Sequence, residues 1–219
     1  MLRHRTFHSF GYDLGLYDQI FWNTLHGHPW ESTISLGLPT PHSYFGDHFS
    51  PIYYAILPVY ALFPHPETLL IVQAAAIALG AIPIYLLARN IFPSAGLRLV
   101  WVLLYFLFLP LAHISLLDFH ETALAILPLG CALYFLQRTR VGWFLFALLI
   151  TFLIKEEMAL IGVGFGLYIL LNRRAPALGI LVTMGSLASF LAILYAVIPA
   201  FNGGRGFAYF PSRYGDLGS

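Results

Sequence analysis

Residues 67–89, ETLLIVQAAAIALGAIPIYLLAR, form a long apolar run with one charged residue at each end. A helix needs about 20 predominantly apolar residues to cross the hydrocarbon core of a bilayer, so this run predicts a transmembrane helix. The whole chain has the same character, because 59% of its residues are hydrophobic and only 10% are charged. A soluble domain carries about 25% charged residues, and we therefore expect an integral membrane protein.

Further apolar runs predict an all-α, polytopic transmembrane helical bundle of about six spans. The run at 141–171 is too long for one crossing at about 1.5 Å per residue, so we divide it at Lys155-Glu156-Glu157. The stretch 51–64 contains Pro58, is too short to cross, and predicts an interfacial or re-entrant helix. The remaining predicted spans are 99–117, 121–137 and 178–198.

Composition also excludes several classes of protein. The net charge is +1, and no basic run is interleaved with stacking aromatics, so we expect no nucleic-acid partner. The lone cysteine, Cys131, lies in an apolar run and is expected to pack as a small apolar residue. The start of the chain has basic residues but no apolar segment after them, which is unlike a signal peptide.

The basic residues predict the orientation in the membrane. With the spans above, the arginines at 89–98, 138–140 and 173–174 fall on one side, which the positive-inside rule makes cytoplasmic. Every acidic residue then lies on the outer side or at its membrane boundary. We expect multi-pass placement in the plasma membrane of a prokaryote. The predicted parts are an outer loop with juxtamembrane helices at 1–66, the bundle at 67–198, and an outer loop or truncated C-terminal segment at 199–219.

The stretch YDLGLYDQIFWNTLHG, residues 12–27, places two carboxylates among aromatic side chains. Apolar residues recur at helical spacing, which predicts an amphipathic helix. Asp13 would lie at or near its N-cap, a position where aspartate accepts backbone N–H bonds. Asp18 falls inside the helix and is not explained by capping. The residues that carry the helical spacing are Leu14, Tyr17, Phe21 and Leu25.

Three more polar motifs interrupt the apolar sequence. FGDHFSP, residues 45–51, brings Asp47 and His48 to the start of an apolar helix, where they fit a helix cap or a site. LLDFHETAL, residues 116–124, has capping-box spacing between its two acids, but His120 is not needed for a cap. Lys155-Glu156-Glu157 fits a hairpin tip or a substrate path, because ionisable residues at a membrane boundary often mark one.

These stretches resemble a predicted membrane-protein family known as domain of unknown function 2079. The resemblance covers the whole chain, and its outer loop followed by a Gly-Asp-His-x-x-Pro turn also resembles the GT-C class of membrane glycosyltransferases. It implies an essential acid early in the first outer loop, here Asp13 first and Asp18 second. It also implies a helix before this loop and further segments after the chain, so the chain is expected to be a fragment. The motifs are YDLGLYDQIFWNTLHG, GDHFSPI, LLDFHE and LIKEEMAL.

The resemblance implies transfer of a sugar from a polyprenyl-phosphate donor on the outer face, with membrane lipid as a further partner. Such a transfer needs a carboxylate to accept the proton of the acceptor hydroxyl and a cation for the leaving phosphate. We expect Lys155, Glu156 and Arg205 to bind the donor phosphate. The remaining donors would hold the acceptor or a divalent metal, Mn²⁺ or Zn²⁺ better than Mg²⁺. They are Asp47, His48, Asp118, His120 and Glu121.

Two other functions fit the sequence. One is a transporter or lipid-carrier flippase, although the predicted spans carry almost no ionisable residues near the midplane, where transporters usually bind their substrate. The other is a non-catalytic lipid-binding protein or scaffold. The enzyme hypothesis predicts that the acids and histidines of separate loops converge, whereas capping alone predicts that each serves its own helix.

Overall fold

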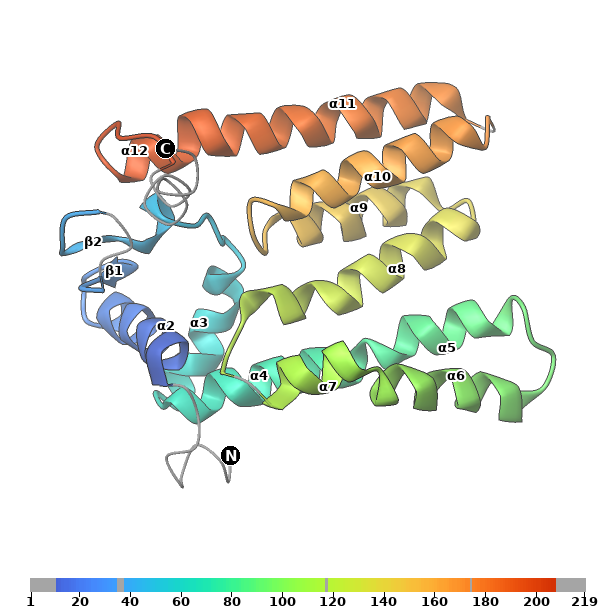
Figure 1. The fold of residues 1–219 in the computed structure, drawn as a ribbon, viewed down its shortest axis with the longest axis horizontal. Helices are drawn as coiled ribbons and strands as arrows, with labels where there is room; N and C mark the ends of the chain where they lie inside the picture. The colour runs from blue at the N-terminus through green and yellow to red at the C-terminus, as the bar shows by residue number, and fades with distance from the viewer. Residues whose placement is uncertain (1–10, 35–37, 117, 174, 208–219) are drawn as a thin grey trace, which may run out of the picture. The chain divides into compact units, whose positions relative to one another are not determined.

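The computed structural model describes residues 11–34, 38–116, 118–173 and 175–207. These residues are mostly helical, which confirms the predicted all-α class (Figure 1). The chain divides into two compact units, and each is described by itself. Unit 1 comprises Met1–Asp18 and Tyr54–Thr151, and unit 2 comprises Gln19–Tyr53 and Phe152–Ser219.

Unit 1 consists of helices joined by short connections. It begins with the first half of α2 and ends within α9, so the unit boundaries do not coincide with helix ends. The helix predicted at 12–27 is confirmed as α2. The elements are α2 (Gly11–Leu25), α3 (Tyr53–Leu62), α4 (Pro66–Leu79), α5 (Ala81–Arg89), α6 (Ala95–Leu107), α7 (Leu109–Leu116), η2 (Glu121–Ala125), α8 (Ile126–Gln137) and α9 (Val141–Phe152).

Unit 2 combines a short two-stranded ribbon with a long helical hairpin. The strands pair antiparallel, with Glu31 opposite Ser43. The last long helix continues through a π-helical segment, η3, into a final short helix. The elements are β1 (Glu31–Ser32), β2 (His42–Ser43), η1 (Tyr44–Gly46), α10 (Met158–Leu171), α11 (Pro176–Ala192), η3 (Ile193–Val197) and α12 (Ile198–Phe201).

Within the part of the chain that the structure describes, two continuous helical stretches are long and apolar enough to cross a membrane. They are Pro66–Arg89 and Pro176–Phe201, each with a mean hydropathy of 2.2. These match the spans predicted at 67–89 and 178–198. The pair α6 and α7 would add a third if it is one broken span. The larger predicted number, about six, stays a prediction.

The span predicted at 99–117 is broken in the structure. Helices α6 and α7 meet at an angle of 51°, and Phe108 between them is extended, with φ −65° and ψ 113°. Pro110 is the cause, because a proline inside a helix has no N–H to donate and its ring clashes with the preceding turn. The Phe108 carbonyl accepts bonds from the amides of Leu111 and Ala112, at 3.0 and 3.1 Å.

The predicted division of 141–171 is confirmed. Helix α9 ends at Phe152 and α10 begins at Met158, so a turn carries the charged triplet. Helix α10 has 14 residues, which at 1.5 Å per residue span only about 21 Å. Helix α3 has 10 residues with Pro58 inside it, and it is too short to cross, as the sequence indicated.

The helices expose much apolar surface, as lipid-facing helices do. Helix α6 has no buried residue, and Leu103 and Leu107 on it are 56% and 66% exposed. Only 17% of the most apolar window of Pro176–Phe201 is buried. Soluble monomers rarely expose apolar patches of this extent, so these faces suit contact with lipid.

Glycines allow α10 and α11 to pack closely side by side (Figure 1). A Cβ added at Gly166 would lie 2.5 Å from the Thr183 backbone nitrogen, and one at Gly179 would lie 2.7 Å from Leu170. Gly162 faces Ser186 and Phe152 in the same way. Small residues at such a contact are typical of helix pairs in membranes, where close packing replaces the hydrophobic effect as the driving force.

Two of the arginine-bearing turns contain a non-glycine residue in the left-handed conformation. Thr139 follows α8 with φ 53°, and Arg173 follows α10 with φ 54°. Helices commonly end in this conformation, but glycine is the usual residue there because it has no Cβ.

The first prediction concerns sidedness. A cysteine replacing exposed His65, before the first span, should react with a membrane-impermeant maleimide on intact cells. A cysteine replacing exposed Thr139 should react only after permeabilisation. The background would be a Cys131→Ser chain. The reverse pattern would remove the basis for an outer-face site.

The second prediction tests the glycine contact. Gly166→Ala should destabilise the protein by about 1–3 kcal/mol, the usual effect of overpacking, because Thr183 has to move. Gly164→Ala is the matched control, since nothing lies within 4 Å of a Cβ at that position of the same helix. Thermal unfolding in detergent would compare the two. Equal midpoints would contradict the close contact.

Candidate functional site

The predicted acid of the first loop contacts the predicted histidine of a distant loop. In unit 1 the Asp13 Oδ2 lies 3.5 Å from the His120 Nε2, with side chains 46% and 37% exposed. Asp13 is in the first turn of α2, and His120 is the residue before η2. The two groups therefore form an accessible carboxylate–imidazole pair that capping alone does not predict.

Hydrogen bonding orients the imidazole of this pair. The His120 Nδ1 lies 2.9 Å from the Asp118 carbonyl oxygen, which only accepts, so Nδ1 carries a hydrogen. Nε2 then faces the carboxylate.

Gln73 fixes the loop that carries His120. Its side chain, 2% exposed on α4, accepts a bond from the His120 amide at 2.6 Å. It donates to the carbonyls of Ile114 and Asp118, at 3.1 and 3.4 Å. One amide group therefore satisfies three backbone groups, one near the end of α7 and two just before η2.

The other two acids of this loop are buried. Asp118 and Glu121 are 3% and 1% exposed, and the Tyr17 hydroxyl donates to Glu121 Oε2. The Tyr17 ring also packs edge-on against Phe119, with centroids 5.1 Å apart. The N-cap residue of η2 is His120, whose side chain makes no capping bond. Glu121 thus contacts α2, which its capping-box spacing did not predict.

Asp18 has a different environment from Asp13. The Tyr60 hydroxyl donates to Asp18 Oδ1 at 2.5 Å. Burial raises the pKa of Tyr60 above its usual value, and the hydrogen bond to Asp18 and its charge raise the pKa further. The phenol therefore stays protonated and acts as a donor. Asp18 is engaged in joining α2 to α3.

A second set of predicted residues meets in unit 2. His48 Nδ1 lies 2.7 Å from Glu156 Oε1, and the two side chains are 10% and 4% exposed. The Phe49 amide donates to Glu156 Oε2 at 3.0 Å. Both carboxylate oxygens are therefore engaged, which is the environment of an acid that holds the 45–51 turn against the start of α10.

His42 accompanies this set and was not predicted. Its Nε2 lies 2.5 Å from Asp47 Oδ2, with side chains 7% and 1% exposed. Asn202 also contacts the turn, because its amide donates to the Gly46 carbonyl at 3.1 Å. A Cβ on Gly46 would lie 2.9 Å from the Asn202 Cβ, so glycine permits this approach.

The two predicted cations lie in the loops of unit 2. Lys155 is partly buried in the turn between α9 and α10, and Arg205 is exposed after α12. The Arg205 amide donates to Asn202 Oδ1 at 3.0 Å. The roles of Lys155, Glu156 and Arg205 toward a phosphate stay predictions, as does convergence of the acids of both units in one cavity.

In the described part of the chain, the histidines and carboxylates of these sites lie in pairs and do not form larger groups that could surround a metal ion. Within the residues that the structure describes, no group of three or more His, Cys, Asp or Glu side chains is placed to hold a metal ion. Zinc sites in proteins usually take three or four such ligands. A divalent metal therefore stays a prediction, and the chemistry below is derived without one.

Sequence reasoning missed the neutral groups that hold the acids. Gln73 is an amide inside the apolar run LLIVQAAAIAL, and polar residues in such runs often bond across helices. Tyr17 is four residues after Asp13, on the same helix face. The sequence therefore contained a signal for the roles of Gln73 and Tyr17. Nothing in the sequence pairs Tyr60 with Asp18 or His42 with Asp47, because these contacts depend on tertiary structure.

The chain belongs to the predicted membrane protein family DUF2079, whose family model matches residues 3–219. The resemblance inferred from the motifs is confirmed for this family. The search of curated proteins found no match, and neither did the search of solved structures.

The third prediction concerns the buried glutamine. Gln73→Leu should destabilise the protein by about 1–3 kcal/mol, because buried backbone groups at 114–120 lose their partner. Gln137→Leu, at the exposed end of α8, is the control. Amide hydrogen exchange should quicken at His120 in the first variant alone. Unchanged exchange there would contradict the role of Gln73.

Proposed function

We propose that this membrane protein is a GT-C-like glycosyltransferase, which moves a sugar from a polyprenyl-phosphate donor to an acceptor on the outer face. The Asp13–His120 pair is the observation that supports this most directly. An acid that only caps a helix has no need of an imidazole from a distant loop, whereas a general base gains from an oriented, ionisable neighbour.

Asp13 is the candidate base because its carboxylate is accessible. Its side chain is 46% exposed, so an acceptor hydroxyl can approach it. Asp18 is held by Tyr60, and Glu121 by Tyr17. These carboxylates already accept hydrogen bonds from the protein, and we assign them to positioning α2.

In the proposed step the acceptor oxygen attacks the anomeric carbon of the donor sugar. Asp13 takes the hydroxyl proton as the new carbon–oxygen bond forms. The bond between the anomeric carbon and the phosphate oxygen breaks, and polyprenyl phosphate leaves with the bonding electrons. The His120 ring lies 3.5 Å from the Asp13 carboxylate and would hold it in position before the step. Lys155 and Arg205 are the proposed cations for the leaving phosphate.

The fourth prediction tests the base. Asp13→Asn should lower the transfer rate from a radiolabelled polyprenyl-phosphate hexose by at least about 100-fold, the usual contribution of a general base. Asp18→Asn should have a smaller effect, because Asp18 acts through α2. The assay would use protein reconstituted in vesicles.

Glu31→Gln serves as the matched control, since Glu31 is a partly exposed carboxylate near His28 in the other unit. It should leave the rate unchanged. Wild-type rates in Asp13→Asn protein would exclude Asp13 as the base. Binding of the lipid donor without any turnover by the natural chain would favour the alternative, a non-catalytic lipid-binding protein or carrier.

A further inference from the structure

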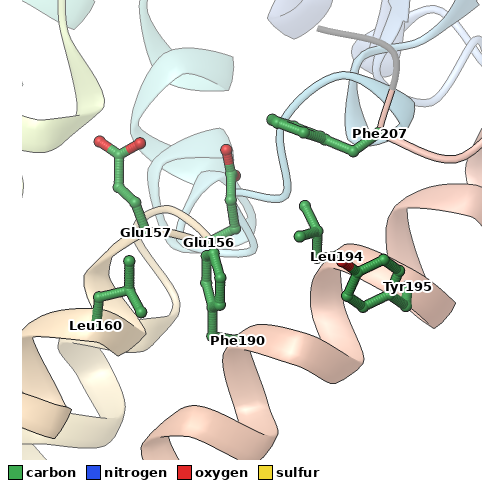
Figure 2. Close-up of a pocket in the computed structure, with 7 residues that line it drawn as sticks. All are labelled: Glu156, Glu157, Leu160, Phe190, Leu194, Tyr195 and Phe207. Carbon is green, nitrogen blue, oxygen red and sulfur yellow. The ribbon is translucent and has the colours of Figure 1, made fainter. Parts of the chain in front are cut away.

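Unit 2 contains a cavity whose walls are largely apolar. It has a volume of about 490 Å³ and is lined by the starts of α10 and η3, the end of α11 and the loop after α12. Figure 2 shows the carboxylates of Glu156 and Glu157 projecting toward the same side as Phe207. The lining residues are Glu156, Glu157, Leu160, Phe190, Leu194, Tyr195 and Phe207.

The packing of α10 on α11 explains why the cavity forms here. The close contact extends to Gly162, which faces Ser186. Nearer the start of α10, the larger residues Leu160 of α10 and Phe190 of α11 replace the small ones and line the cavity. Leu194 and Tyr195 come from the π-helical segment η3, and such segments occur often at functional sites.

The loop that forms the remaining wall is held in place. The Asn202 side chain, 7% exposed, donates to the Gly206 carbonyl at 2.6 Å and to the Gly46 carbonyl at 3.1 Å. Phe207 follows directly and packs edge-on toward His48, with ring centroids 6.3 Å apart. The cavity is therefore a built feature of the unit.

The charges of the cavity favour a cation over an anion. Glu157 is the N-cap residue of α10, but its side chain makes no capping bond. The amides of Met158, Ala159 and Leu160 donate to carbonyls of the preceding turn, so the helix start has no amide for a phosphate among these three. Among the described lining residues none is a lysine, arginine or histidine.

We propose that this cavity binds a single-chain amphiphile with an amine or quaternary ammonium head. The head would pair with the exposed Glu157 carboxylate and contact the faces of Tyr195 and Phe207, since aromatic rings attract cations. The aliphatic chain would lie against Leu160, Phe190 and Leu194. A volume of about 490 Å³ suits one such ligand, because ligand sites span about 300–1,000 Å³. This inference does not depend on the proposed transferase activity.

The experiment compares three photoreactive dodecyl probes that differ only in their head: trimethylammonium, hydroxyl or sulfonate. Each is cross-linked to the full chain in uncharged maltoside micelles, and the labelled peptides are identified by mass spectrometry. The trimethylammonium probe should label peptides containing Leu160 and Leu194 most strongly, and added salt should weaken its labelling. This comparison uses the natural sequence, so it does not depend on the folding of a variant.

Glu157→Gln should weaken binding of the trimethylammonium probe about fivefold, as expected for one partly exposed charge pair next to aromatic rings. It should leave the hydroxyl probe unchanged. Glu31→Gln, a carboxylate of the same unit outside the cavity, should change neither probe. Leu160→Trp should fill the cavity and abolish labelling by all three.

Three outcomes would overturn the proposal. Equal labelling by the trimethylammonium and hydroxyl probes would reduce the cavity to an apolar site without charge selection. Stronger labelling by the sulfonate would indicate an anionic ligand. Displacement of the probe by phosphatidylethanolamine, but not by dodecyltrimethylammonium, would identify a diacyl lipid as the occupant in place of a single chain.

Discussion

A carboxylate buried in an apolar protein needs hydrogen-bond donors, and this requirement shapes both units of the structure. Removing a charged group from water is strongly unfavourable unless partners replace the water. The buried Glu121 takes a donor from Tyr17, and the partly buried Asp18 takes one from Tyr60. Glu156 receives the imidazole of His48 and the amide of Phe49. In each case the donor comes from a segment that is distant in sequence. The hydrogen bond to the acid therefore also fixes how the two segments pack.

Asp13 differs from these acids in its partner, and the proposed roles rest on that difference. Glu156, Glu121 and Asp18 each accept a hydrogen bond from a group of the protein. Asp13 is about half exposed and faces an imidazole whose orientation is set by the Asp118 carbonyl and by Gln73. Unit 1 thus contains acids that hold the fold and, in Asp13, an acid that is accessible to a substrate.

The helices and their interruptions could be predicted from the sequence, while most partners of the polar groups could not. Apolar run length predicted 67–89 and 178–198, and the charged triplet at 155–157 predicted a break, because both depend on local composition. The bend at Phe108 also has a local cause, Pro110. It was not predicted, because the span at 99–117 was inferred from the length of its apolar run alone. Asp13 does contact His120, while convergence of the other predicted residues in one cavity stays a prediction. The hydrogen-bond donor of Asp18 is determined by the packing of α2 against α3. The periodicity of a single sequence does not predict that packing.

The left-handed backbone of Arg173 has a consequence that depends on the predicted membrane orientation. Glycine would relieve Arg173 of a conformation that costs other residues about 1 kcal/mol. A basic side chain near an anionic leaflet is worth about 1 kcal/mol in return. In the predicted orientation the two terms nearly cancel, so glycine at this position would leave folding almost unchanged and would remove one of the charges that select the cytoplasmic side. In that orientation the arginine would act on sidedness more than on folding, and a stability measurement alone would not detect its effect.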